Sequence, residues 1–356
     1  MKNRITTTFD TFFGEIEIGD DLPCGLIAEI GLNHNGSEIL AMKMIEAAAY
    51  AGATFVKFQK REPTALATKD FLDSPFAKCP ALGTNQRIVR ERLELDLDVY
   101  VRLRKYAESL GLIFFASAFD IPSLHFLIEA GVGIIKIASH SLTNQPLINE
   151  VKKTCLPVIL SLGGSTDKEQ EKVIDLLRVN PLVLMHCVSS YPTADNIAKL
   201  DTISLLKEKY SLPVGFSSHE RGIDLSIAAS TIGAALIERH FTINRSMVGL
   251  DQSISLEPSE FSKMSKIIKR VFSARGVQIG MQELEKNVKN AYHVSICSSR
   301  DLKKGEVLNS NDVVCKQPLK DANEYFTGLE LDKVIGRKLN SDILSDKPIA
   351  RRFIEQ

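Results

Sequence analysis

The chain has 356 residues, of which 44% are hydrophobic and 25% are charged, and its formal net charge at pH 7 is zero. This length can hold one large domain with a sizeable core and a smaller domain beside it. The balanced charge gives no indication of a nucleic-acid partner, and no apolar run approaches the ~18 residues that a membrane span needs. The N-terminal stretch is too polar for a secretory signal, and the six cysteines form no CxxC pair. We therefore expect a cytoplasmic protein with reduced thiols and with neither a nucleic-acid nor a membrane partner.

Eight short apolar runs alternate with helix-like segments along most of the chain. The predicted strands cover 25–31, 54–59, 112–119, 133–139, 157–163, 181–187, 213–219 and 235–241. The predicted helices cover 37–52, 96–111, 121–131, 144–154, 167–179, 198–210, 223–233 and 258–274. Apolar runs between helices are typical of a parallel sheet that is buried on both faces, and eight such units favour a closed (β/α)₈ TIM barrel. A doubly wound open sheet is the alternative, but GLNHNG after the first strand lacks its GxGxxG turn.

The alternation of apolar runs and helix-like segments stops after residue 275, which predicts a barrel domain at 1–275. Residues 276–292 are predicted to be a polar linker. Residues 293–356 combine short apolar alternation with turn signals such as KKGE and NSND, which predicts a small, strand-poor and turn-rich second domain.

Polar side chains are concentrated at the ends of the predicted strands, where TIM barrels carry their chemistry. They are Glu29, Lys57, Gln59, Ser117, Lys136, Ser139, Ser161, Ser189, Tyr191, Ser217, His219, Glu238 and His240. Two buried lysines are costly unless they are paired or solvated, and with neighbouring hydroxyls they indicate a ligand rich in negative charge. Phosphate and carboxylate are the groups that fit.

His219 and His240 end the last two predicted strands, which should be neighbours about 5 Å apart. Two imidazoles at equivalent heights could share one divalent ion and leave coordination positions open. On spacing alone, two core histidines that are satisfied by local hydrogen bonds remain the more frequent arrangement. His186, inside the sixth strand, is predicted to be a core histidine of that kind.

Several motifs occur in the order that is seen in the sialic acid synthase family. They are AEIGLNHNG, VKFQ, KIASHSLTNQPLI, VILSLGG, LMHCVSSYPT, VGFSSHERGIDLSIAA, GAALIERHF and SLEP. The tail, SSRDLKKGEVLNSNDVVCKQP followed by VIGRKLNSDI, resembles the antifreeze-like SAF domain of that family, a β-clip fold. The resemblance runs from about residue 20 to about residue 350 and implies a nonulosonic acid synthase. Such an enzyme condenses phosphoenolpyruvate with an open-chain N-acyl-mannosamine-like sugar and releases phosphate by C–O cleavage.

The resemblance also implies roles for individual residues. His219 and His240 would hold a divalent metal, Mn²⁺ in the first place and Mg²⁺ or Co²⁺ as alternatives, and Glu29 would assist proton transfer. Phosphoenolpyruvate would be bound by Lys57, Ser117, Lys136, Ser139, Ser161, Ser189 and Ser217. The sugar would be bound by Gln59, Tyr191, Glu238, Asp251 and Gln317. The family arrangement implies a domain-swapped homodimer in which each small domain covers the partner's barrel.

The sequence departs from the family pattern at several positions. Ser218 stands where the family has an aspartate, which predicts the loss of an acidic group behind the site. Gln317 stands where the family has an arginine, and LKDANEYF at 319–326 replaces a Gly-rich loop. Residues 61–95 match the family poorly. These departures favour an acceptor other than plain N-acetylmannosamine, or a reduced activity. Another phosphoenolpyruvate-dependent 3-deoxy-2-keto acid synthase and a non-catalytic sugar-phosphate-binding barrel remain the alternatives.

Overall fold

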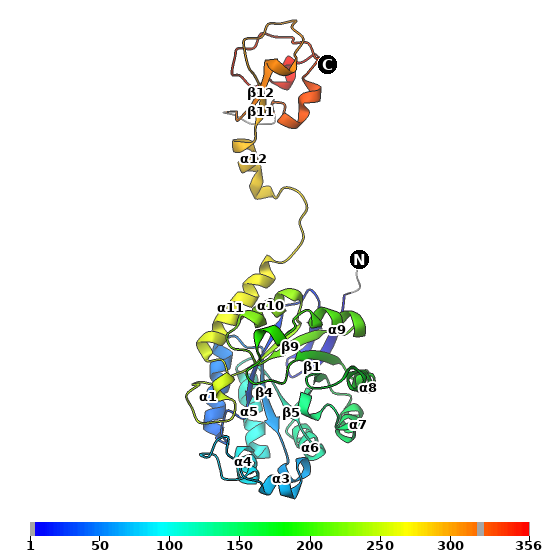
Figure 1. Cartoon of the computed structure of the whole chain (residues 1–356), viewed down its shortest axis with the longest axis vertical. Helices are drawn as coiled ribbons and strands as arrows, with labels where there is room; N and C mark the ends of the chain where they lie inside the picture. Colours follow the sequence, from blue (N-terminus) through cyan, green and yellow to red (C-terminus); the bar gives the residue numbers. More distant parts are fainter. Residues whose placement is uncertain (1–3, 319–323, 356) are drawn as a thin grey trace. The chain divides into compact units, whose positions relative to one another are not determined.

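The computed structural model describes residues 4–318 and 324–355. The chain divides into two compact units, Met1–Arg275 and Gly276–Gln356 (Figure 1). Most of the predicted loop at 319–326 lies outside the described residues.

The first unit is built around a closed eight-stranded parallel barrel, as predicted. Its strands pair in the order β10-β3-β4-β5-β6-β7-β8-β9. They are β3 (Gly25–Gly31), β4 (Phe55–Lys60), β5 (Ile113–Ala118), β6 (Ile135–Ile137), β7 (Val158–Ser161), β8 (Leu182–Cys187), β9 (Val214–Ser218) and β10 (Leu236–His240). Each of the eight predicted strands is present. The fourth one is shorter than predicted, because the chain turns into the 3₁₀ helix η1 (Ser139–Ser141) after β6.

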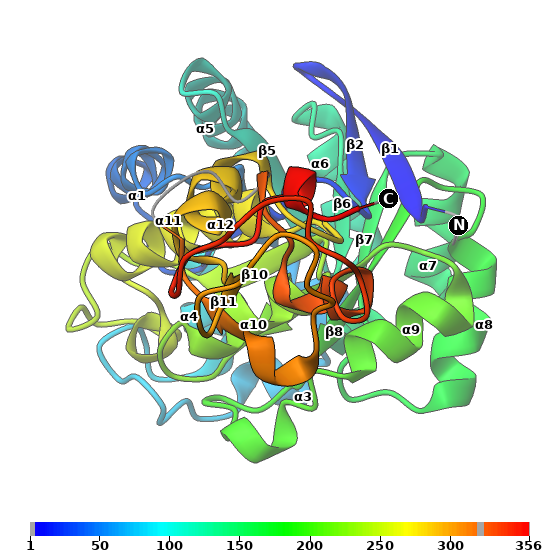
Figure 2. The same cartoon turned by 90° about the horizontal axis from the view of Figure 1, so that it is seen from above.

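Helices surround the strands and bury their outer faces (Figures 1 and 2). The helices of the repeating units are α1 (Glu38–Tyr50), α5 (Leu97–Ser109), α6 (Ile121–Glu129), α7 (Gln145–Thr154), α8 (Asp167–Leu177), α9 (Thr202–Tyr210), α10 (Asp224–Ile232) and α11 (Pro258–Ala274). Local sequence explains their starts: Ser37, for example, accepts a hydrogen bond from the Leu40 N–H at the N-terminus of α1. Helix α9 begins later than predicted, after the 3₁₀ turn η2 (Asp195–Ile197).

A β-hairpin precedes the barrel, and the polar N-terminal sequence gives little sign of it. It consists of the antiparallel strands β1 (Thr6–Thr11) and β2 (Gly14–Gly19) (Figure 2). Phe9 is fully buried and Ile18 nearly so, and both belong to the same apolar core as the barrel strands. The hairpin packs beside the N-terminal ends of β5 and β6, where Phe12 and Ile134 line one small cavity. The hairpin therefore extends the core at the end of the barrel opposite the C-terminal strand ends.

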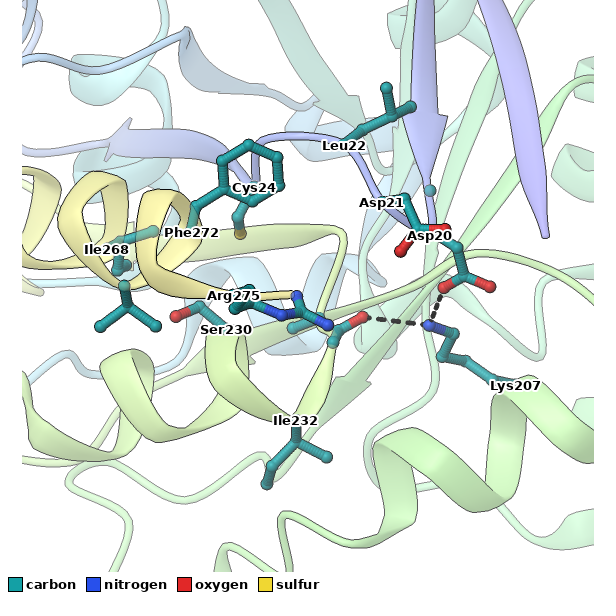
Figure 3. Close-up of a pocket in the computed structure, with 14 residues that line it drawn as sticks. Asp20, Asp21, Leu22, Cys24, Lys207, Ser230, Ile232, Ile268, Phe272 and Arg275 are labelled. Carbon is teal, nitrogen blue, oxygen red and sulfur yellow. Dashed lines mark hydrogen bonds and ion pairs between the residues drawn. The ribbon is translucent and has the colours of Figure 1, made fainter. Parts of the chain in front are cut away.

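Polar contacts fasten the hairpin to the helices around this N-terminal end (Figure 3). The Lys207 ammonium at the end of α9 contacts the carboxylate of Asp20 and donates to the Gly233 carbonyl at 3.2 Å. Gly233 ends α10 with a φ of 107°, a conformation that favours glycine. Asp20, Lys207 and Gly233 line a separate cavity of only about 80 Å³, together with Cys24 and Arg275.

Residues 61–95, which match the family poorly, form helical structure. They contain the helices α2 (Pro63–Leu66), α3 (Lys69–Asp73) and α4 (Gln86–Leu93). Val89 and Leu93 of α4 pack in a small apolar cluster with Leu32 and Leu82. This cluster fixes the segment to the loop that follows β3, so it forms one wall above the C-terminal ends of the strands.

The second unit has few strands and many turns, as the sequence predicts. It begins with η4 (Glu283–Glu285) and α12 (Lys286–Tyr292), and its antiparallel strands are β11 (Ser295–Ser298) and β12 (Val313–Lys316). Its described part also contains the 3₁₀ turns η5 (Ser310–Asp312), η7 (Gly328–Lys333) and η8 (Arg351–Phe353). It has its own apolar core, which includes Ile296, Leu339 and Ile349. No helix in the described ranges is long and apolar enough to cross a membrane.

Candidate active site

A cavity of about 650 Å³ lies at the C-terminal ends of the barrel strands. All the predicted site residues except Gln317 line it, together with Arg61, Lys78, Phe119, His140, Gly163, Gly164, Cys187 and Leu250. The fold therefore brings together side chains that are spread over more than two hundred residues of sequence. Gln317 belongs to the second unit, where its amide donates to the Ala291 carbonyl.

Glu29 is held beside the end of β4. Its Oε1 accepts a hydrogen bond from Gln59 Nε2 at 2.7 Å, and its Oε2 lies 3.0 Å from Lys57 Nζ. The register of β3 against β4 shifts between Glu29 and Gly31. Gly31 has a φ of +54°, and a Cβ atom there would lie 3.0 Å from Glu29 Oε1 and 3.1 Å from Gln59 Nε2. A glycine is therefore required where the strand bends around this carboxylate–amide pair.

Two lysines and Glu238 form a buried charged cluster at the floor of the cavity. Lys57 Nζ lies 3.4 Å from Glu238 Oε1, and Lys136 Nζ lies 3.5 Å from Glu238 Oε2. Both lysines also donate to serines: Lys57 to Ser117 at 3.2 Å and Lys136 to Ser161 at 2.7 Å. Because the two ammonium groups face the carboxylates of Glu29 and Glu238, the cluster is balanced in charge, which makes its burial tolerable.

The environment separates the proton affinities of these groups. Burial would raise the pKa of Glu238, but Lys136 and Lys57 outweigh burial and hold that pKa at about 2. Burial raises the pKa of Glu29, and Lys57 opposes the effect only in part. Burial lowers the pKa of Lys136, whereas the two glutamates overcome burial and raise the pKa of Lys57. Glu238 is thus a permanent anion, and Glu29 is the carboxyl more able to carry a proton.

Hydroxyl groups line the side of the cavity next to Lys136. Ser139 Oγ accepts from the Gly163 N–H at 3.1 Å and lies 3.7 Å from Cys187 Sγ. A Cβ atom at position 163 would lie 2.7 Å from Ser189 Oγ and 2.9 Å from Ser139 Oγ. Gly163 therefore allows the two serines and a backbone N–H to converge, an arrangement suited to an anion.

The two predicted metal ligands lie side by side. The ring centroids of His219 and His240 are 5.4 Å apart, and the Tyr191 ring lies 4.1 Å from that of His219. Burial, and then the neighbouring His240, lower the pKa of His219 to about 3, so its imidazole is neutral at pH 7. Its Nδ1 lies 3.1 Å from the Val188 carbonyl oxygen, which can only accept a hydrogen bond. Nδ1 therefore carries the hydrogen, and Nε2 keeps its lone pair.

The two imidazoles could supply some, but not all, of the ligands of a divalent ion. His240 Nδ1 is buried without a hydrogen-bond partner in the described chain, and Asp251 Oδ2 lies 4.0 Å from it. Within the same ranges, however, no three His, Cys, Asp or Glu side chains come together as a ready ligand set. Two neutral imidazoles would therefore need oxygen ligands from substrate or water to complete an ion's coordination. His186, by contrast, is the predicted core histidine, with Nε2 2.6 Å from the Ala198 carbonyl.

The outer side of β9 carries Ser218, where the family has an aspartate, and Glu220 follows two residues later. Ser218 Oγ points out of the barrel to Ser226 Oγ of α10, 3.3 Å away. Behind β10, the buried Arg239 guanidinium donates to Glu220 Oε1 at 2.9 Å and to Ser226 Oγ at 2.9 Å. Glu220, two residues after Ser218, therefore gives this side of the barrel a buried carboxylate that pairs with Arg239, and the effect of Ser218 on the site stays a prediction.

Two family models match the chain. The model of the NeuB family matches residues 44–280, and the model of the SAF domain matches residues 293–351. The chain belongs to the NeuB family.

Relatives of this NeuB-family chain match it over most of their length. It is 35% identical to the N,N'-diacetyllegionaminic acid synthase of Campylobacter jejuni, over 82% of this chain and 90% of that protein. It is 33% identical to the N-acetylneuraminate-9-phosphate synthase of Drosophila melanogaster, over 91% and 94% of the two chains. Among solved structures, the N-acetylneuraminic acid synthetase of Leptospira borgpetersenii in complex with citrate is similar, with 33% identity and a TM-score of 0.69. The match covers 81% of this chain and 96% of that one.

Sequence reasoning did not identify Arg61, Lys78 or His140 as lining residues. Arg61 and Lys78 belong to the segment that resembles the family least, and His140 follows a strand that ends earlier than predicted. The one sequence signal was the density of cations between residues 60 and 92.

Proposed function

We propose that this protein is a nonulosonic acid synthase, which condenses phosphoenolpyruvate with the open-chain aldehyde form of an N-acyl amino sugar. The observation that carries the proposal is the placement of the lysine–serine cluster and the histidine pair in one cavity. The lysine–serine cluster suits the phosphate and carboxylate of phosphoenolpyruvate. The histidine pair suits a metal ion that polarises an aldehyde oxygen. Membership of the NeuB family and the names of the relatives support the same reaction.

The chain's own residues would divide the work between two substrates. Lys57, Lys136 and the serine hydroxyls bind the phosphate and carboxylate of phosphoenolpyruvate. His219 and His240 would hold a divalent ion, Mn²⁺ in the first place, and when bound the ion supplies Lewis-acid polarisation of an aldehyde oxygen. Gln59, Tyr191 and Asp251 orient the sugar so that its aldehyde carbon faces C3 of phosphoenolpyruvate.

The bonds that change are balanced by one water molecule. C3 of phosphoenolpyruvate attacks the aldehyde carbon, water adds at C2, and the C2–O bond breaks to release phosphate and the 2-keto acid. The lysines stabilise the negative charge of the departing phosphate. Glu29 would exchange a proton with the attacking water or the new alkoxide. Burial, which raises its pKa, and the hydrogen bond from Gln59 support this role.

We also propose that the protein works in the cytoplasm as a domain-swapped homodimer. Val277, Ile279 and Leu284, at the start of the second unit, are 93%, 96% and 85% exposed. Apolar side chains so exposed suit burial against a second copy. Light scattering at micromolar concentration should give twice the chain mass, and a monomer that turns over at full rate would contradict the swap.

The test of the reaction is phosphate release from phosphoenolpyruvate with Mn²⁺ and a panel of acceptors. The panel contains N-acetylmannosamine, its 6-phosphate, 2,4-diacetamido-2,4,6-trideoxyhexoses and arabinose 5-phosphate. Release that depends on one hexosamine supports the proposal and identifies the acceptor. Release with arabinose 5-phosphate alone would contradict the proposal and indicate a different 3-deoxy-2-keto acid synthase. Tight binding of phosphoenolpyruvate without phosphate release would favour a non-catalytic barrel.

A further inference from the structure

Arg61 leaves hydrogen-bonding capacity unused at the edge of the cavity. It follows directly after β4, is 9% exposed, and its Nε donates to Glu94 Oε1 at 3.1 Å. Its Nη2 is buried and has no partner among the described residues, and its side chain lines the cavity. A guanidinium carries five N–H donors, and leaving a buried one unpaired is unfavourable. The position is therefore set up for an acceptor that the protein itself does not supply.

The positive charge around Arg61 is also only partly compensated. Lys60 Nζ lies 3.1 Å from Glu94 Oε2, so Lys60 and Arg61 share a single carboxylate. Lys78 lines the same cavity, and neither it nor Arg90 has a carboxylate within 4 Å in the described ranges. This wall therefore carries more positive than negative charge, in contrast to the balanced cluster around Lys57 and Lys136.

The positive charge of this wall contributes to the lowered pKa values of two nearby histidines. The pKa of His140, which also lines the cavity, is lowered first by burial and then by the charges of Arg90 and Arg61. The pKa of His34 is lowered to about 4, again by burial first and by Arg61 second. Both effects have the sign that an excess of positive charge near Arg61 produces.

We propose that Arg61 and Lys78 form an anion-binding subsite for an acidic group, phosphate or carboxylate, on the acceptor sugar. This inference rests on the proposed synthase function. Lys57 and Lys136 already provide the cations for phosphoenolpyruvate at the floor of the cavity. Arg61 comes two residues after Gln59, beyond the end of β4, on the side assigned to the sugar. The planar guanidinium matches either acid with two parallel hydrogen bonds.

Matched acceptors that differ in one group test the subsite. The rate of phosphate release is measured with N-acetylmannosamine, with its 6-phosphate and with N-acetylmannosaminuronate. The proteins are the wild type, Arg61→Gln, Lys78→Ala and the control Arg87→Gln. Arg87 lies on α4 in the same segment, is paired with Asp73 and does not line the cavity. Lys78 is exposed, so its replacement should leave folding intact.

We expect the wild type to prefer one of the acidic acceptors, which also distinguishes phosphate from carboxylate. Arg61→Gln and Lys78→Ala should each lower kcat/KM for that acceptor by about 10- to 100-fold. They should leave kcat/KM for the neutral sugar and KM for phosphoenolpyruvate unchanged, and Arg87→Gln should change none of these values. A preference for the neutral sugar, or a rise confined to the KM for phosphoenolpyruvate, would overturn the subsite.

A binding measurement separates this inference from the synthase proposal. Calorimetric titration of N-acetylmannosamine 6-phosphate and of N-acetylmannosaminuronate needs no turnover. At least one of the two should bind Arg61→Gln more weakly than Arg87→Gln. If no acceptor is turned over but this difference is present, the reaction is wrong and the subsite stands. Equal binding of both acids by the two variants would overturn the subsite whatever the reaction is.

Discussion

The two ends of the barrel solve opposite problems. At the N-terminal end, Phe9 and Ile18 of the hairpin extend the apolar core, and the polar contact of Lys207 with Asp20 lies beside it. At the C-terminal end, Lys57 and Glu238 are buried as deeply as core residues, yet they are charged. The N-terminal end is stabilised by removing apolar surface from water, and the C-terminal end tolerates burial only because its charges are paired. The hairpin extends the apolar core at one end, and the candidate active site lies at the other.

The largest effect should come from the histidine pair, whose loss tests the C-terminal end as a site of chemistry. His219→Ala or His240→Ala should lower Mn²⁺-dependent phosphate release by ~10³-fold or more, because either change removes an imidazole ligand. Calorimetry should show lost Mn²⁺ binding with little change in Tm. His125→Ala, on the exposed face of α6, is the control. Full activity in both variants would contradict the assignment of His219 and His240 as metal ligands.

The next effect tests whether pairing is what makes the buried charges tolerable. Lys57→Met leaves Glu29 and Glu238 buried without their shared cation. We expect the free energy of unfolding to fall by ~3–5 kcal/mol, measured by urea denaturation at pH 7. Lys105→Met, at an exposed position on α5, should change it by less than ~0.5 kcal/mol. A Lys57→Met protein as stable as the wild type would mean that the pairs do not stabilise this end.

A change in the hairpin should affect stability without affecting chemistry. Phe9→Ala removes a fully buried ring, which should lower the free energy of unfolding by ~3 kcal/mol and leave KM for phosphoenolpyruvate unchanged. Phe12→Ala, in the same hairpin, removes a ring that is 71% exposed and should have little effect on stability. The contrast between the two ends would be contradicted if Phe9→Ala were as stable as the wild type. It would also be contradicted if the folded variant had an altered KM for phosphoenolpyruvate.

The last effect is absent at neutral pH and concerns acid stability at the C-terminal end. The pKa of the buried His34 is about 4, below the ~6.5 of an unfolded chain. Above pH 6.5 the residue is neutral in both states and does not affect stability. As the pH falls from 6.5 to 4 the unfolded state binds the proton first, so His34 should contribute a loss of up to ~3 kcal/mol. In urea titrations from pH 7 to 4, His34→Gln should flatten this decline, whereas the exposed His125→Gln should not.

Much of the barrel could be predicted because its signal is local. An apolar run followed by a capped helix, repeated eight times, indicates a parallel sheet and favours a closed barrel over an open sheet. The strand-end positions of Lys57, Lys136, His219 and His240 follow from the same pattern, since parallel strands of a barrel present their C-terminal ends together. The family motifs then added roles for these residues that spacing alone leaves open.

Pairing across the fold could not be read from the chain, because it depends on which side chains meet in space. Lys57 lies between Glu29 and Glu238 only because β10 closes the barrel against β3. Glu220 pairs with Arg239 only because that arginine points out of the neighbouring strand. Arg61 is free to face the cavity because Glu94, after three intervening helices, engages just one side of its guanidinium. Local periodicity specifies which elements form, whereas long-range contacts decide which charges remain available for a ligand.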